Sequence, residues 1–168
     1  MSTNSTKKRV LFLDIDGPMI PYRAKYLPTQ TAVMTKFDPI AVAMINDLCK
    51  EFEDLKIVLH SSWVYINGGK ETLDHCVEQG ILRENFYESD PYVNENITWR
   101  YNRIAEWLER HPEITGYVVV DDTPYEADFA GEYKHPQELN SRLVLIDYND
   151  GITMRNLEEI WEVINEHG

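Results

Sequence analysis

The chain has 168 residues, of which 16 are basic and 29 acidic, so its formal net charge is −13. This length fits one domain and leaves little room for a second, and a hydrophobic fraction of 43% is typical of a globular protein rather than a disordered one. No stretch approaches the roughly 20 uninterrupted apolar residues of a membrane helix. The negative charge repels a nucleic-acid backbone at long range, unless a local basic patch offsets it.

The first residues, MSTNSTKKR, are polar, and the apolar run that follows is short and contains two aspartates, so the segment does not resemble a secretory signal. We therefore expect a disordered tail over residues 1–8, one domain over 9–168 and a cytoplasmic location. The two cysteines, Cys49 and Cys76, have no metal-like spacing. We expect both to be reduced and buried, as free cysteines commonly are.

Short apolar runs rich in Val, Ile and Leu predict buried strands over residues 9–14, 56–60, 117–121 and 142–147, and a short extended piece near 86–87 could add a fifth. Helical patterns lie between these runs. Asp38 and Pro39 form a helix start, followed at helical spacing by the apolar residues Ile40, Met44, Leu48 and Phe52.

Three further helices are predicted along the chain. A weaker helix over 69–79 ends at Gly80. A strongly amphipathic helix begins near Thr98 and ends before Pro112, with an apolar face that contains Tyr101, Ile104, Trp107 and Leu108. Thr153 begins the last helix, whose apolar side contains Leu157, Ile160, Trp161 and Ile164.

Alternating strands and helices predict an α/β fold, a three-layer Rossmann-like parallel sheet with helices on both faces. In such folds ligands bind beyond the carboxyl ends of the strands. The search for functional residues therefore begins where each predicted strand ends.

The first predicted strand ends in the sequence LFLDIDGP. Extended backbone points Asp14 and Asp16 to one side while Ile15 enters the core, and Gly17 lets the chain turn sharply. Two close carboxylates repel each other unless a cation or a shared proton separates them. A simple turn or helix cap also suits Asp and Gly, so this stretch alone leaves both interpretations open.

A second acidic pair, Asp121 and Asp122, follows another predicted strand in VVVDDTP. In a parallel sheet this pair reaches the same edge as Asp14 and Asp16. Carboxylates gathered there destabilise the fold through repulsion and desolvation, unless a hard divalent cation neutralises them. Oxygen ligands of this kind select Mg²⁺, so we expect a Mg²⁺ site.

The second predicted strand ends in LHSSW. Ser61 could hold a phosphate oxygen, and Ser62 is its rival for that role. We expect a structural role for His60 and a place near the site for Trp63. Upstream of the second acidic pair, a helical arginine at position 100 could supply a positive charge, although a solvated helix face fits most such arginines.

The sequence motifs at the strand ends, taken in order, resemble those of a known protein family. The order LFLDIDGP, IVLHSS, an Arg-bearing helix and VVVDDTP resembles the four motifs of the haloacid dehalogenase-like (HAD) phosphohydrolase superfamily, especially its small Mg²⁺-dependent members with little or no cap domain. HSSW, IAEWLERHPEITGYVVVDD and RLVLIDYNDGIT also resemble phosphatase domains found with nucleic-acid end-repair enzymes. The resemblance runs from about residue 9 to 153.

The resemblance implies roles for the acidic residues. Asp14 would be the nucleophile that forms an aspartyl-phosphate, and would also bind Mg²⁺. Asp16 would protonate the leaving oxygen and later activate water, with its backbone carbonyl on the metal. Asp122 would bind the metal directly, Asp121 would lie in or next to its coordination sphere, and Glu126 is a weaker candidate.

The resemblance also implies which residues bind phosphate. Ser61 would bind the phosphoryl group, and Arg100 would replace the lysine usual at the third motif. An arginine is a planar donor with several N–H groups, whereas a lysine is a single point donor, so the replacement is not exact. Arg103 and Lys70 are therefore alternatives for this role. Pro18 departs from the Thr or Val usual in the first motif and removes an amide donor.

The acid-free segment 18–37 follows the first motif, where this family places a flap or small cap. It contains Tyr22, Arg23, Lys25 and Lys36, whose charges would face an incoming phosphate, although a solvated loop is an equal alternative. We expect that replacing Arg23 and Lys25 with Ala raises KM with little change in kcat. Because a large cap does not fit here, an open site suits a bulky phosphorylated substrate, such as a nucleic-acid end or a phosphoprotein.

The leading hypothesis is thus a Mg²⁺-dependent phosphatase that acts on a phosphomonoester. The favoured substrate is the phosphate of a nucleotide or of a nucleic-acid end. A phosphoprotein or small-metabolite phosphatase and a non-catalytic HAD-like binding domain are the alternatives. A phospho-accepting signalling receiver is disfavoured because KIVLHSSW has no carboxylate after the strand. Dehalogenation is disfavoured because it needs no metal, whereas the two acidic pairs indicate one.

Overall fold

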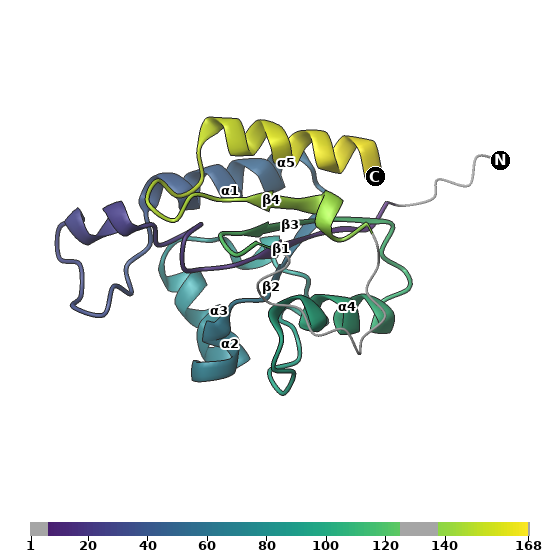
Figure 1. Ribbon diagram of the computed structural model, residues 1–168, viewed down its shortest axis with the longest axis horizontal. Helices are drawn as coiled ribbons and strands as arrows, with labels where there is room; N and C mark the ends of the chain where they lie inside the picture. Colours follow the sequence, from purple (N-terminus) through teal and green to yellow (C-terminus); the bar gives the residue numbers. More distant parts are fainter. Residues whose placement is uncertain (1–6, 125–137, 168) are drawn as a thin grey trace.

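The computed structural model describes residues 7–124 and 138–167, and its centre is a parallel sheet (Figure 1). In the described part of the chain the sheet has four strands in the order β2-β1-β3-β4. These strands are β1 (Arg9–Leu13), β2 (Leu55–Leu59), β3 (Gly116–Asp121) and β4 (Leu143–Leu145). The predicted α/β class and parallel sheet are confirmed.

The strand register brings the ends of three strands to one level. Leu13 is paired with Leu59 on one side and with Val120 on the other. Just beyond it, the amide of Asp14 donates to the carbonyl of Val120 at 3.0 Å, and the amide of His60 donates to the carbonyl of Leu13 at 3.2 Å. The residues that follow β1, β2 and β3 therefore meet at the same edge of the sheet.

Helices cover both faces of the sheet. Figure 1 shows α1 (Pro39–Glu51) and α5 (Met154–His167) on one face and α4 (Arg100–Arg110) on the other. The sheet supplies alternate side chains to the two sides: Leu11 and Leu13 pack in the larger apolar cluster with α1 and α5, whereas Phe12 packs with α4. The short helices α2 (Ser62–Asn67) and α3 (Gly69–Glu78) follow β2 and add side chains to the larger cluster.

Helix α1 begins where the sequence predicts, but its buried side leaves out Ile40. The Asp38 carboxylate accepts a hydrogen bond from the amide of Ile40 at 2.9 Å, which caps the helix. The buried stripe runs through Ala41, Ile45 and Leu48, and Ile40 is 59% exposed. Leu48, Met44 and Phe52 of the predicted face pack in the larger apolar cluster, whereas Ile40 was wrongly included, because it lies at the margin of this face.

The predicted fifth strand near residues 86–87 is also wrong. Phe86 and Tyr92 each form an isolated bridge with β2, at Ile57 and Leu59. Between these bridges a turn interrupts the pairing, and Pro91 has no amide to donate. The segment thus covers the outer edge of β2 without forming a continuous strand.

The segment 18–37 projects beyond the carboxyl end of the sheet (Figure 1). It contains the 3-10 helix η1 (Tyr22–Tyr26). The Gln30 side chain holds the rest of the segment together: its amide nitrogen donates to the carbonyls of Ala24 at 3.0 Å and Lys36 at 2.9 Å, and its oxygen accepts from the amide of Lys36 at 2.9 Å. This flap is an ordered loop fixed by its own hydrogen bonds.

Two smaller predictions can be compared with the structure. Cys49 and Cys76 are both free and buried, and burial raises the pKa of each thiol to about 12, so both thiols stay protonated. Lys8, the last residue of the predicted tail, exchanges hydrogen bonds with Thr115. In the ranges described, no helix combines the length and hydrophobicity needed to cross a membrane.

Candidate active site

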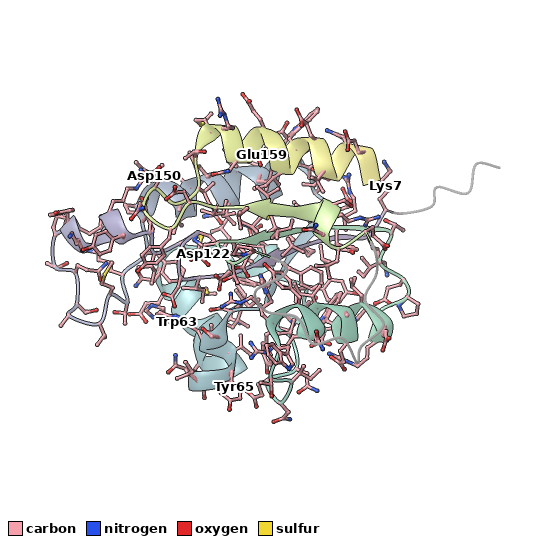
Figure 2. The ribbon with its side chains drawn as sticks, viewed as in Figure 1. Lys7, Trp63, Tyr65, Asp122, Asp150 and Glu159 are labelled. Carbon is pink, nitrogen blue, oxygen red and sulfur yellow. The ribbon has the colours of Figure 1, made fainter. Side chains whose placement is uncertain are left out.

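Three carboxylates gather at the carboxyl end of the sheet. Asp14 follows β1, Asp121 is the last residue of β3 and Asp122 is next to it, and each offers an oxygen within 4.8 Å of the other two. Asp14 and Asp121 are buried, and Asp122, labelled in Figure 2, is half-buried. This donor set of hard oxygen atoms fits a divalent cation such as Mg²⁺.

The electrostatic environment of Asp14 supports that fit. Both carboxylate oxygens of Asp14 are buried, and Oδ2 lies against the guanidinium group of Arg100. Burial, and next the negative charge of Asp121, hold the pKa of Asp14 well above its ordinary value, although Arg100 opposes them. Burial likewise raises the pKa of Asp122. A bound divalent cation would stabilise the ionised form of both groups.

Arg100 supplies the positive charge of the site. It is the first residue of α4, and its Nη1 lies 3.1 Å from Oδ2 of Asp14 and 3.0 Å from Oδ2 of Asp121. The guanidinium group of Arg103 instead donates to the carbonyls of residues 97 and 98. Lys70 is 78% exposed at its side chain and forms an ion pair with Asp74. Arg100 thus contacts two members of the carboxylate cluster directly.

Both oxygens of Asp121 have protein partners. Its Oδ1 accepts a hydrogen bond from the amide of Thr123 at 2.8 Å, and its Oδ2 lies 3.0 Å from Arg100 and 3.3 Å from Nε2 of His60. Tyr101 in turn donates a hydrogen bond from its hydroxyl to the carbonyl of Thr123. These contacts fix the orientation of Asp121.

The turn after β1 lies close to Asp122. Gly17 has φ of +97°, and a Cβ at this position would lie 2.7 Å from the Cβ of Asp122. Glycine is therefore required here for both its backbone conformation and its size. Asp16, which precedes it, is exposed, and its Oδ2 accepts a hydrogen bond from Nε1 of Trp63 at 3.0 Å.

A comparison with known protein families agrees with this arrangement. The model of a family described as HAD domain in Swiss Army Knife RNA repair proteins matches residues 10–157. The chain belongs to this family. No curated protein and no solved structure matches it. The family match confirms the resemblance to HAD phosphohydrolases related to nucleic-acid repair proteins, and it supports a phosphohydrolase activity for this HAD domain.

The two serine candidates lie beside the carboxylates along the sheet edge. Ser61 follows His60 directly and is fully buried, and its Oγ accepts a hydrogen bond from the amide of Trp63 at 3.2 Å, capping α2. Its hydroxyl hydrogen can still be donated to a ligand, because a serine hydroxyl is both donor and acceptor. Ser62 is the first residue of α2 and is partly exposed.

The flap candidates are held apart from the carboxylate cluster. Arg23 forms an ion pair with Asp38 at 2.7 Å, and Nζ of Lys25 donates to the Tyr22 hydroxyl at 2.9 Å. The amide of Tyr22 donates to the carbonyl of Tyr148 at 2.8 Å, which anchors η1 on the loop after β4. Within the described ranges, the contacts of these three flap residues do not include the acidic cluster. Glu126, the weakest metal candidate, lies outside the described residues.

Two further residues lie beside the carboxylates. His60, for which the sequence predicts a structural role, is fully buried, and its Nε2 lies 3.3 Å from Oδ2 of Asp121. Its position could have been found from the strand register, since His60 follows β2 at the level where Asp14 follows β1. Trp63 was expected near the site, but its contact with Asp16 joins two segments 47 residues apart and has no local sequence signal.

Proposed function

We propose that this HAD domain is a Mg²⁺-dependent phosphatase that hydrolyses a phosphomonoester through an aspartyl-phosphate on Asp14. The observation that carries the proposal is the environment of Asp14: a buried carboxylate that contacts Arg100 and lies within 4.8 Å of two further carboxylates. A nucleophilic carboxylate in a phosphatase needs this combination of a free oxygen, a metal site and a neighbouring cation.

In this proposal Asp14, Asp122 and the backbone carbonyl of Asp16 would hold a Mg²⁺ ion. Asp121 would orient the site without binding the ion directly, because both of its oxygens already have protein partners. The cation, when bound, withdraws charge from the phosphoryl oxygens and lowers the repulsion between the phosphate and the attacking carboxylate.

The reaction divides into two steps carried by the chain's own residues. The Asp14 carboxylate attacks phosphorus while Asp16 gives a proton to the leaving oxygen. Asp16 then takes a proton from the water that hydrolyses the aspartyl-phosphate. Arg100 and the Ser61 hydroxyl hold the phosphoryl oxygens, with Ser62 as the rival hydroxyl for this role.

We propose a nucleotide or, in preference, a nucleic-acid end as the substrate. The description of the family as a domain of RNA repair proteins supports this choice. The short segment between β1 and α1 leaves the site without a large cap, which suits a bulky substrate. Tyr22, Arg23 and Lys25 of the flap would contact the substrate beyond its phosphate. A cytoplasmic location remains a prediction, with which two free buried thiols agree.

The test is phosphate release from p-nitrophenyl phosphate, mononucleotides, a phosphopeptide and oligonucleotides phosphorylated at the 3′ or 5′ end, each with Mg²⁺ or with a chelator. We expect metal-dependent release that is fastest on an oligonucleotide end and falls at least about 10³-fold in Asp14→Asn. Preference for the phosphopeptide or for a mononucleotide would replace the proposed substrate class. A folded protein that binds Mg²⁺ but releases phosphate from no substrate would favour a non-catalytic binding domain.

A further inference from the structure

The indole of Trp63 contacts the carboxylate to which the proposed function gives the acid and base steps. Its Nε1 lies 3.0 Å from Oδ2 of Asp16, and the two residues follow neighbouring strands, Trp63 after β2 and Asp16 after β1. Trp63 belongs to α2, and Figure 2 shows it at the end of the sheet where Asp122 also lies. We propose that Trp63 is a positioning residue that fixes the carboxyl group of Asp16 in one orientation, with Oδ2 on the indole and Oδ1 turned to the substrate. This inference rests on the proposed function.

Trp63 is itself held at several points. Its amide donates to Oγ of Ser61 at 3.2 Å, and its carbonyl accepts from the hydroxyl of Thr72 at 3.1 Å. Its ring stacks on that of His75, with centroids 5.4 Å apart and an interplanar angle of 27°. Nε2 of His75 lies 2.7 Å from the carbonyl oxygen of Thr35 at the end of the flap. The direction of the indole N–H is therefore set before any substrate binds.

Asp16 needs such a partner because its side chain is exposed. An exposed carboxylate rotates among rotamers, and holding an acid or base in the productive geometry accounts for much of its catalytic effect. The hydrogen bond from Trp63 removes that freedom without burying the group. Substrate can thus still reach Asp16.

The chemistry of the indole determines which oxygen of Asp16 it holds. Indole N–H is only a donor, so Oδ2 of Asp16 accepts this hydrogen bond. In the proposed reaction Oδ1 is therefore the oxygen turned to the ester oxygen and later to the attacking water. The bond from Trp63 to Oδ2 persists through both steps, and Trp63 exchanges no proton.

The test compares good and poor leaving groups in Trp63→Phe, which keeps an aromatic ring beside His75 and removes the N–H group. An alkyl alcohol needs protonation as it leaves, whereas p-nitrophenolate hardly does. We expect kcat for a phosphorylated oligonucleotide end to fall about 10-fold or more, and kcat for p-nitrophenyl phosphate to fall less than about 3-fold, with KM nearly unchanged for both. Equal losses on both substrates would overturn the inference, because a packing defect does not depend on the leaving group.

Two further variants separate the hydrogen bond from the shape of the ring. Replacement of Trp63 by benzothienylalanine substitutes sulfur for N–H in a ring of nearly the same size, so it reproduces the expected pattern even if Trp63→Phe folds poorly. Trp161→Phe is the matched control: the Trp161 indole also donates to a carboxylate, Oε1 of Glu51 at 3.1 Å, but from α5. Normal kinetics are expected in Trp161→Phe, and a leaving-group effect of the same size there would overturn the inference.

A double-mutant cycle tests whether Trp63 acts through Asp16. In an Asp16→Asn background, with the phosphorylated oligonucleotide end as the substrate, adding Trp63→Phe should lower the residual kcat no further. An additional loss equal to that of the single variant would contradict the positioning role. Failure of the proposed function is recognised separately, because wild-type protein would then release no phosphate, whereas failure of this inference leaves wild-type activity intact.

Discussion

The contact between Gly17 and Asp122 sets the geometry of the site at the scale of single residues. The turn that follows Asp14 and Asp16 passes so close to Asp122 that a methyl group at position 17 would overlap its side chain. The same glycine has a positive φ, which L side chains rarely adopt. One residue thus determines how near the two acidic segments approach each other.

We predict that Gly17→Ala displaces Asp122 and weakens the metal site. The Mg²⁺ concentration for half-maximal activity should rise, and kcat/KM should fall by about 10²-fold, the loss typical of a misplacement of about 1 Å at a catalytic site. Gly80→Ala is the matched control, because Gly80 also has a positive φ, of +111°, but ends α3 instead of joining the acidic segments. Equal behaviour of the two variants would show that backbone strain, and not the contact with Asp122, causes the loss.

At the scale of elements, Arg9 joins three parts of the fold opposite the site. Its side chain makes two hydrogen bonds to Asp54, at 2.5 and 2.7 Å, and a third to the carbonyl of Ile164 in α5 at 3.2 Å. The guanidinium group also lies 5.4 Å from the centre of the Phe52 ring. The start of β1, the turn before β2 and the end of α5 are thus tied together by one buried cation.

We predict that Asp54→Asn lowers the free energy of unfolding by about 2 kcal/mol at pH 7, since it leaves a buried arginine with a weaker partner. The hydrogen bond from Arg9 lowers the pKa of Asp54, so its contribution is present above the unfolded-state value of about 3.9 and is lost as the pH falls through the folded-state value. Urea unfolding at pH 7 and below pH 4 measures both effects. A stability difference that does not shrink in acid would contradict this account.

Asp74→Asn is the control variant for the effect of Asp54→Asn on the free energy of unfolding. Asp74 also contacts two cations, Lys70 and Arg83, at 3.1 and 3.0 Å, but all three side chains are well exposed. Exposed ion pairs contribute little because solvent screens them. No measurable change in unfolding is expected for this variant.

Arg23 and Lys25 of the flap, both predicted from the sequence to contact substrate, have different surroundings in the structure. Arg23 is bound to Asp38, the cap of α1, so part of its role is structural. Nζ of Lys25 lies 4.0 Å from the centre of the Tyr22 ring and 5.0 Å from that of Tyr26, and both tyrosines are exposed. An exposed cation between two aromatic rings can meet both a phosphate and a nucleobase.

We predict that Lys25→Ala raises KM for a phosphorylated oligonucleotide about 3- to 10-fold with kcat nearly unchanged, because it removes ground-state binding outside the reacting centre. The effect should decrease at high salt. Lys70→Ala removes the same charge from the exposed surface of α3 and should leave KM unchanged. If the two variants change KM equally, the cause is the overall charge and the flap has no specific role.

At the scale of the whole molecule, much of the fold and of the acidic cluster could be predicted. Parallel strands bring their carboxyl ends together, so the positions of Asp14 and Asp121 relative to the four predicted strands were sufficient to bring them close. The helices at 39–51, 69–78, 100–110 and 154–167 lie within a few residues of their predictions, since each has a strong apolar pattern or a clear cap.

The parts that could not be predicted depend on contacts between distant segments. Helix α2 has six residues, too few to show a helical period. The strand-like segment after α3 is broken by a turn between its two bridges to β2. The link from Asp16 through Trp63 to His75 requires α2 and α3 to be placed in space first. Local patterns carry no information about such links.

Charge is distributed unevenly over the molecule. The chain carries a net charge of −13, yet segment 18–37 has no acidic residue. Most of the surface would therefore repel a polyanionic substrate, and the repulsion would be weakest on the side of the flap. This asymmetry agrees with an approach of the substrate at the carboxyl end of the sheet, from which the flap projects (Figure 1).

The measurement that tests the central claim most directly is the trapping of phosphate on Asp14. Wild-type protein is mixed with a labelled substrate and Mg²⁺, denatured in acid within the first turnover, digested and analysed by mass spectrometry. We predict a phosphorylated peptide containing Asp14, absent when a chelator replaces Mg²⁺ and absent in Asp14→Asn. Full phosphate release by Asp14→Asn, or turnover in which the label sits on another residue, would contradict the account.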